Sequence, residues 1–132
     1  MSAIRSLAAA AALLVLGACM HAGNPTPATL AGRFELVSYD GKPLPTPSLG
    51  EPEFTVQSGV LVLGARDSAE LTMTVQRRGA AGTLMHSVAG RYRVTGDSLV
   101  VTMPAGEMRG VANGATLALR TPDGSRTVFR RL

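Results

Sequence analysis

The chain has 132 residues, a formal net charge of +4 at pH 7 and no tryptophan, and only 4% of its residues are aromatic. This length suits one domain with a modest hydrophobic core. The basic residues are scattered, whereas a nucleic-acid surface usually combines a basic stripe with aromatic stacking platforms, so we expect no nucleic-acid partner.

Residues 1–18 have the pattern of a secretory signal peptide. One basic residue, Arg5, precedes a short apolar run, and small residues follow that run at a potential cleavage site. The run is too short to cross a bilayer comfortably, because a spanning helix needs about 20 apolar residues. The segment ends in Leu16-Gly17-Ala18-Cys19, and Cys19 is the only cysteine of the chain. These four residues resemble the lipobox of bacterial lipoproteins.

The lipobox resemblance implies that Cys19 becomes the first residue of the mature protein and carries acyl chains such as palmitate. Several acyl chains hold a protein firmly on a membrane, since each buried CH₂ contributes about 0.8 kcal/mol. Met20 follows where an Asp would retain an enteric lipoprotein in the inner membrane. We therefore expect an envelope protein, anchored in the outer membrane and facing the periplasm. The alternative is a plain secreted protein in which Cys19 is incidental.

Residues 19–29 contain two prolines and no apolar period, so we expect the lipidated cysteine to be followed by a flexible tether. Residues 30–132 then form the predicted domain, in which short strands alternate with turns. Strands are expected at Arg33–Asp40, Glu53–Gln57, Val60–Leu63, Ala69–Arg78, Leu84–Thr95, Ser98–Met103, Glu107–Ala112, Ala115–Arg120 and Arg126–Arg131.

The turns between these strands carry their own signals. Ser58-Gly59 is expected to be a turn, and Asn113-Gly114 is the strongest hairpin signal of the chain. The segment Lys42–Pro52 contains four prolines. Because proline lacks a ladder donor, we expect this segment to be a long loop outside any sheet.

The fold class follows from the regular spacing of strands and turns. We predict an all-β fold, an antiparallel up-and-down meander of about eight or nine short strands closed as a barrel, with a β-sandwich as the alternative. Closure is favourable because it removes exposed strand edges.

Gly32-Arg33-Phe34 opens the first predicted strand. It resembles the start of lipocalins, in which Gly-x-Trp opens the first strand and a large first loop covers the barrel mouth. Residues 30–45 (LAGRFELVSYDGKPLP) also resemble the opening of small bacterial lipocalin-like lipoproteins of unassigned function. Phe34 replaces the tryptophan, the chain is short for a lipocalin, and no C-terminal helix is visible. The resemblance implies structural roles for Gly32, Phe34 and Arg130, with Arg130 or Arg131 packing over Phe34.

The apolar faces of the predicted strands provide candidate ligand-lining residues. In one interpretation they only fill the core, and in the other they line a small apolar pocket under the proline loop. The candidates are Leu71, Met73, Val75, His86, Tyr92, Leu99 and Leu117.

The residue pattern gives little support for a catalytic site or a metal site. His86 and Ser87 are adjacent on a strand and so point to opposite faces, which prevents them from acting as a base and nucleophile pair. No zinc-ligand spacing is present, and the methionines form no copper-binding cluster. We expect no enzyme activity, no metal and no cofactor.

Two functional hypotheses follow. The first is a lipid-anchored envelope binding module that holds a small apolar or amphiphilic ligand. The second is a packed barrel that binds another envelope protein through its loops. An apolar mouth beneath the proline loop would favour the first. A filled interior with a polar rim would favour the second, and that rim would consist of Arg77, Arg78, Arg91 and Arg93.

Overall fold

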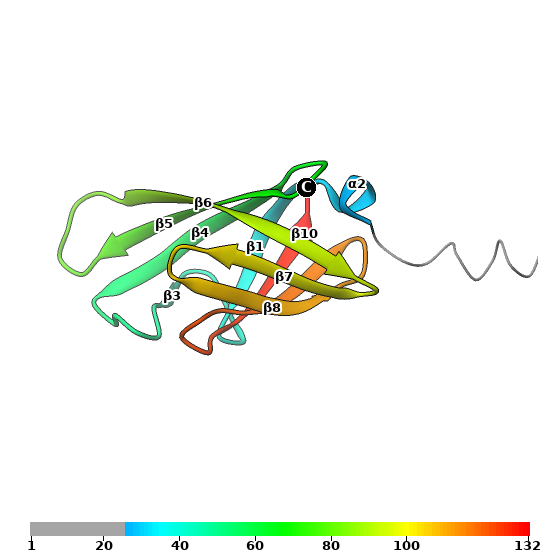
Figure 1. Cartoon of the computed structure of the whole chain (residues 1–132). Coiled ribbons are helices and arrows are strands. Elements are labelled where there is room, and N and C mark those ends of the chain that lie inside the picture. The colour runs from blue at the N-terminus through cyan, green and yellow to red at the C-terminus, as the bar shows by residue number, and fades with distance from the viewer. Residues whose placement is uncertain (1–25) are drawn as a thin grey trace, which may run out of the picture.

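The alternating residues of the domain build eight long strands, which close into an antiparallel barrel in the computed structural model (Figure 1). The structure describes residues 26–132, so the predicted signal peptide and Cys19 lie outside the described residues. The barrel strands are β1 (Gly32–Tyr39), β4 (Phe54–Leu63), β5 (Ser68–Arg77), β6 (Leu84–Thr95), β7 (Ser98–Met103), β8 (Gly106–Ala112), β9 (Thr116–Arg120) and β10 (Arg126–Arg131).

Strand β1 closes the barrel because it pairs with strands on both sides. Phe34 lies opposite Leu61 of β4 and opposite Arg131 of β10, and every other barrel strand pairs antiparallel with its neighbours in the chain. This is the predicted all-β up-and-down meander, and the ring of pairings makes it a lipocalin-like barrel and not a sandwich.

The prediction that Lys42–Pro52 lies outside any sheet is partly wrong, because this proline segment contains two short strands. Strand β2 (Lys42–Pro43) pairs with the end of β1, and β3 (Thr46–Pro47) pairs with the start of β4. Each is only two residues long and lies at a sheet edge, where a proline can be tolerated because its missing donor can face away from the neighbouring strand.

The predicted turn at Ser58-Gly59 is also wrong, since β4 runs through it. Val56 lies opposite Val75 and Ser58 lies opposite Thr74, so Gln57 is an extra residue in a β-bulge. The bulge bends the strand without ending it, and two predicted strands become one.

The core fills the barrel, and it reaches the end where the described chain begins. Seven large side chains are at most 1% exposed, and they are Leu30, Phe34, Leu61, Leu99, Val101, Leu117 and Phe129. The short helix α2 (Pro27–Leu30) covers this end, and its Leu30 is 1% exposed. Residues 27–29, at the end of the predicted tether, thus lie in a helical turn.

Of the two arginines that the lipocalin resemblance left open, Arg131 packs over Phe34. Its Cζ lies 4.7 Å from the centroid of the Phe34 ring. Arg130 lies one residue earlier on β10, so it points to the outside of the barrel, where it forms an exposed ion pair with Glu35. The structural role assigned to Arg130 thus belongs to Arg131. Gly32 has a φ of +151°, which residues with a side chain rarely adopt, and a Cβ there would lie 2.6 Å from Nη1 of Arg131.

Candidate functional site

Three apolar side chains of β5 lie on the face of the sheet that continues the barrel interior, and yet they stay partly exposed. Leu71, Met73 and Val75 alternate with polar residues, so they share one face, and that face packs against the margin of the core. Their cross-strand partners on β6 are Val88, His86 and Leu84. Together these six residues form what we call the open face.

The open face is uncovered because β6 changes partner along its length. Its first half pairs with β5, whereas only Arg91–Thr95 pairs with β7. Within residues 26–132, no strand pairs with the other edge of Leu84–Gly90. Strands β4, β5 and β6 consequently run out beyond the rest of the barrel (Figure 1), and Leu84 and Met85 are 58% and 74% exposed.

Gly90 marks the point at which β6 meets β7. A Cβ at this position would lie 2.1 Å from the carbonyl oxygen of Thr102 and 2.7 Å from Sδ of Met103. No side chain fits there without a shift of the β7 backbone. The sequence signal for this approach is the glycine itself, since a glycine inside a strand marks a bend or a close backbone contact.

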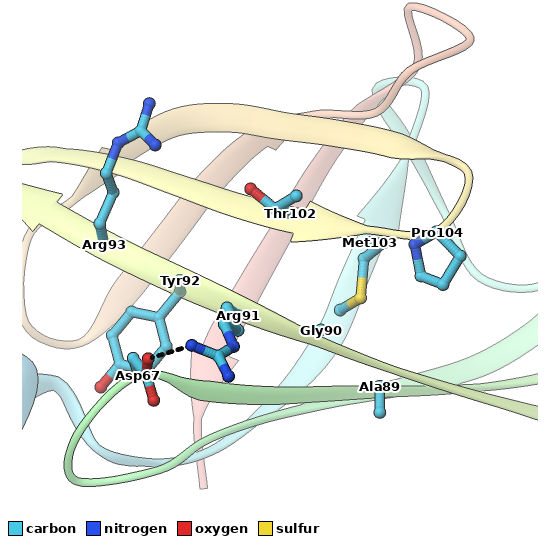
Figure 2. A pocket seen from close by; sticks show the side chains of 9 residues that line it. All are labelled: Asp67, Ala89, Gly90, Arg91, Tyr92, Arg93, Thr102, Met103 and Pro104. Atoms are coloured by element: carbon cyan, nitrogen blue, oxygen red, sulfur yellow. Dashed lines mark hydrogen bonds and ion pairs between the residues drawn. The ribbon is translucent and has the colours of Figure 1, made fainter.

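A hollow of 570 Å³ opens along the seam between β6 and β7 (Figure 2). Tyr92 and Met103 line it and are themselves buried, and an exposed ion pair of 3.3 Å joins Arg91 to Asp67 at its margin. The Tyr92 hydroxyl donates to the carbonyl oxygen of Gly64. Burial raises the pKa of Tyr92 above its ordinary value, and the negative charge of Asp67 adds to this. Tyr92 is therefore a neutral donor that holds the β4–β5 loop.

The proline segment folds against the barrel. Leu44 packs against the core, Thr46 is 4% exposed, and the backbone N–H of Leu49 lies 3.5 Å from the Tyr39 hydroxyl. The open face lies close to this segment, because Val75 pairs with Val56 and Val56 pairs with Thr46 of β3. Beside the loop, a smaller hollow of 300 Å³ is lined by Arg77, Arg78 and Glu53 among others.

The predicted ligand-lining residues fall into two groups. Tyr92, Leu99 and Leu117 belong to the packed core, where their exposed fractions are 4%, 0% and 0%. Leu71, Met73, Val75 and His86 belong to the open face, and His86 is exposed. The structure therefore brings together four of the seven predicted residues on an accessible surface.

Comparison with known proteins found no relative of this chain, so an argument about function depends on the open face and the surface around it. No protein-family model, no curated protein and no solved structure matches the chain. Among residues 26–132, no three His, Cys, Asp or Glu side chains gather into a potential metal site. In the same part of the chain, no helix is long and apolar enough to cross a membrane.

Two features of the surface were missed by sequence reasoning. The free edge of β6 was missed because alternation shows which face a residue takes but not how many neighbours its strand has. Several arginines also line up across strands on the outer wall. They are far apart in the sequence, and only the cross-strand register shows that they are adjacent.

Proposed function

We propose that this chain is a lipid-anchored binding module of the bacterial cell envelope, and that it holds an amphiphilic ligand with an anionic head group. The observation that carries the proposal is the open face, where Leu71, Met73 and Val75 stay partly exposed instead of completing the core. Burying apolar surface contributes about 25 cal/mol per Å². A ligand chain along β5 would bury apolar surface that stays exposed in the protein alone, and this burial would stabilise the complex.

Charge at one end of the open face supports an anionic head group. By alternation, Arg77 follows Val75 on the same side of β5, and Arg78 comes next in the turn. Arginine presents a planar fork of donors that matches a carboxylate or phosphate. An apolar stripe that ends in two arginines suits a fatty acid or a similar amphiphile.

The anchor is supported by the lipobox resemblance at Cys19. Residues 20–25 separate this cysteine from the first described residue, and an extended chain spans about 3.5 Å per residue. Helix α2 would thus lie within about 25 Å of the membrane surface. The free end of the β5–β6 hairpin lies at the opposite end of the barrel (Figure 1), so it would point away from the membrane that carries the anchor.

The test uses residues 20–132, which include the whole closed barrel, and palmitate as the probe. Native mass spectrometry of the wild type should show one added palmitate that disappears on solvent extraction. Met73→Lys should lose this mass because it places a charge on the open face. Thr74→Lys is the matched control, since residue 74 points to the opposite face, and it should keep the mass. A bare mass for the wild type, or equal binding by both variants, contradicts the proposal.

Two observations favour a second candidate, a protein-interaction module. Core residues such as Leu99 and Leu117 fill the barrel interior, and the outer edge of β6 is free in the part of the chain that the structure describes. Within residues 26–132, the edge of Leu84–Gly90 that faces away from β5 has no strand partner. The segment carries neither proline nor a charged residue that would discourage pairing. An extended segment of another envelope protein could add to this edge as a further strand. Met85→Arg would then weaken partner binding while palmitate binding stayed unchanged, which separates the two candidates.

A further inference from the structure

Four arginines form one row across the outer wall of the barrel. Arg93 of β6 lies opposite Val100 of β7, and Val100 lies opposite Arg109 of β8. Arg109 lies opposite Arg120 of β9, and Arg120 lies opposite Arg126 of β10. We call Arg93, Arg109, Arg120 and Arg126 the arginine row. All four are exposed, and the row is separate from the open face.

The row concentrates positive charge that the protein itself neutralises only in part. Arg109 forms an exposed ion pair with Glu107, and Arg120 donates to the carbonyl oxygen of Gly124 at 3.3 Å. Within residues 26–132, Arg93 and Arg126 have no ion pair or side-chain hydrogen bond. Like charges directly opposite on neighbouring strands destabilise a sheet. A row of this kind therefore costs stability unless an anion occupies it.

The wall beneath the row is apolar and hollowed. Val100 faces outward and does not belong to the core cluster, yet it is only 8% exposed, as expected where long arginine stems lie over a wall. A hollow of 260 Å³ lies among Arg109, Arg120 and Arg126, beside the small side chain of Ala118. The guanidinium groups thus stand at the margin of a depression that a ligand group can enter.

The shape of the row selects a flexible linear polyanion. Neighbouring strands lie about 4.8 Å apart, so the row extends over roughly 20 Å from β6 to β10. It follows a convex wall that comprises five of the eight barrel strands, so a flat membrane would touch only part of it. Every aromatic side chain of the chain is buried or half-buried, so the row offers no platform for stacking bases.

We propose that the arginine row binds a linear anionic polysaccharide through its repeated oxyanion groups. Each guanidinium can hold a carboxylate or phosphate with two parallel hydrogen bonds. The sugar rings would lie over the apolar wall between the arginines. The row would hold a polymer of the envelope against the side of the barrel while the open face binds its own ligand.

The experiment measures binding of fluorescein-labelled polygalacturonic acid to the purified full chain in a non-ionic detergent, by fluorescence anisotropy. The row variant carries Arg109→Gln, Arg120→Gln and Arg126→Gln. The control variant loses the same charge at exposed positions outside the row, through Arg33→Gln, Lys42→Gln and Arg66→Gln. We expect the row variant to bind at least about tenfold more weakly and the control less than about twofold, with affinity falling steeply as salt rises.

Melting temperatures and the binding of other ligands distinguish this proposal from its alternatives. The row variant should melt at or above the wild-type temperature, because it removes opposed charges, so weaker binding cannot come from unfolding. Equal losses in the row and control variants would overturn the proposal in favour of a net-charge effect. Binding of neutral dextran or of an oligothymidylate as tight as that of polygalacturonate would overturn it as well. Binding to anionic lipid vesicles that depends on the row, without binding to polygalacturonate, would also overturn the proposal.

Discussion

Arg131 packs over Phe34 at the end of the barrel that α2 covers, and it joins three other segments of the chain to β10. Its guanidinium lies over the ring of Phe34, with Cζ 4.7 Å from the centroid. Nη1 donates to the carbonyl oxygen of Ala31 at 3.0 Å, and Nη2 lies 3.2 Å from the carbonyl oxygen of Thr29. Nε donates to the carbonyl oxygen of Gly114 at 2.9 Å. One side chain of β10 thus ties down α2, the start of β1 and the β8–β9 loop.

Arg131→Ala should lower the free energy of unfolding by about 2–3 kcal/mol, since it removes a cation–π contact and several charge-assisted hydrogen bonds. Arg130→Ala is the matched control from the next position. It breaks only an ion pair in which the arginine side chain is 65% exposed, so it should cost less than about 1 kcal/mol. Urea unfolding followed by circular dichroism measures both values. Equal costs would show that Arg131 does not fasten this end of the barrel.

Gly90→Ala should destabilise the protein by about 1–3 kcal/mol, because the new methyl group would overlap the backbone of β7. The nearest atom is the carbonyl oxygen of Thr102 at 2.1 Å, which cannot turn aside as a side chain can. Gly82→Ala is the control, since nothing lies within 4 Å of a Cβ there. That change should stay within about 0.5 kcal/mol of the wild type in the same urea measurement. A neutral result at Gly90 would mean that the seam between β6 and β7 is loose.

The strands could be predicted from the sequence because alternation and turn residues are local signals. Asn113-Gly114 shows this well: Gly114 has a positive φ of 91°, and the Asn113 side chain accepts a hydrogen bond from the backbone of Thr116. The bulge at Gln57 could not be predicted, because it depends on the register against β5. Four residues of the open face, Leu71, Met73, Val75 and His86, were predicted as part of a larger set, and the sequence could not separate them from the core. That separation depends on where β6 leaves β7.

A polar cluster at the other end of β10 should make stability depend on pH. Ser125 Oγ lies 2.7 Å from Oδ1 of Asp123 and 3.1 Å from the Tyr39 hydroxyl, and Thr121 also donates to Asp123. Burial acts to raise the pKa of Asp123, but hydrogen bonds from Thr121, Ser125 and Tyr39 outweigh it and hold the pKa below its ordinary value of 3.8. A depressed pKa in the folded state contributes stability above the unfolded-state value, and that contribution is lost as the pH falls through the folded-state pKa.

Asp123→Asn should therefore flatten the pH dependence of unfolding in the acidic range. The wild type should lose stability as the pH falls from about 5 toward the depressed folded-state pKa, whereas the variant should lose less over the same range. Urea midpoints at a series of pH values measure this difference. Glu51→Gln serves as the matched control, because it removes a carboxylate that is exposed in the proline segment. Parallel curves for the wild type and Asp123→Asn would exclude the cluster as a source of the pH dependence.

In the proposed function Cys19 carries the acyl chains, so Cys19→Ala should abolish the membrane anchor. In a bacterial host fed with an alkyne analogue of palmitate, the wild type should take up the label and sediment with membranes. The variant should be unlabelled and either soluble or an unprocessed precursor. Met20→Asp keeps the cysteine and should stay labelled, while its sedimentation should shift to the inner membrane of an enteric host. A Cys19→Ala protein that is still cleaved and still sediments with membranes would rule out the lipobox, and the open face would then belong to a secreted protein.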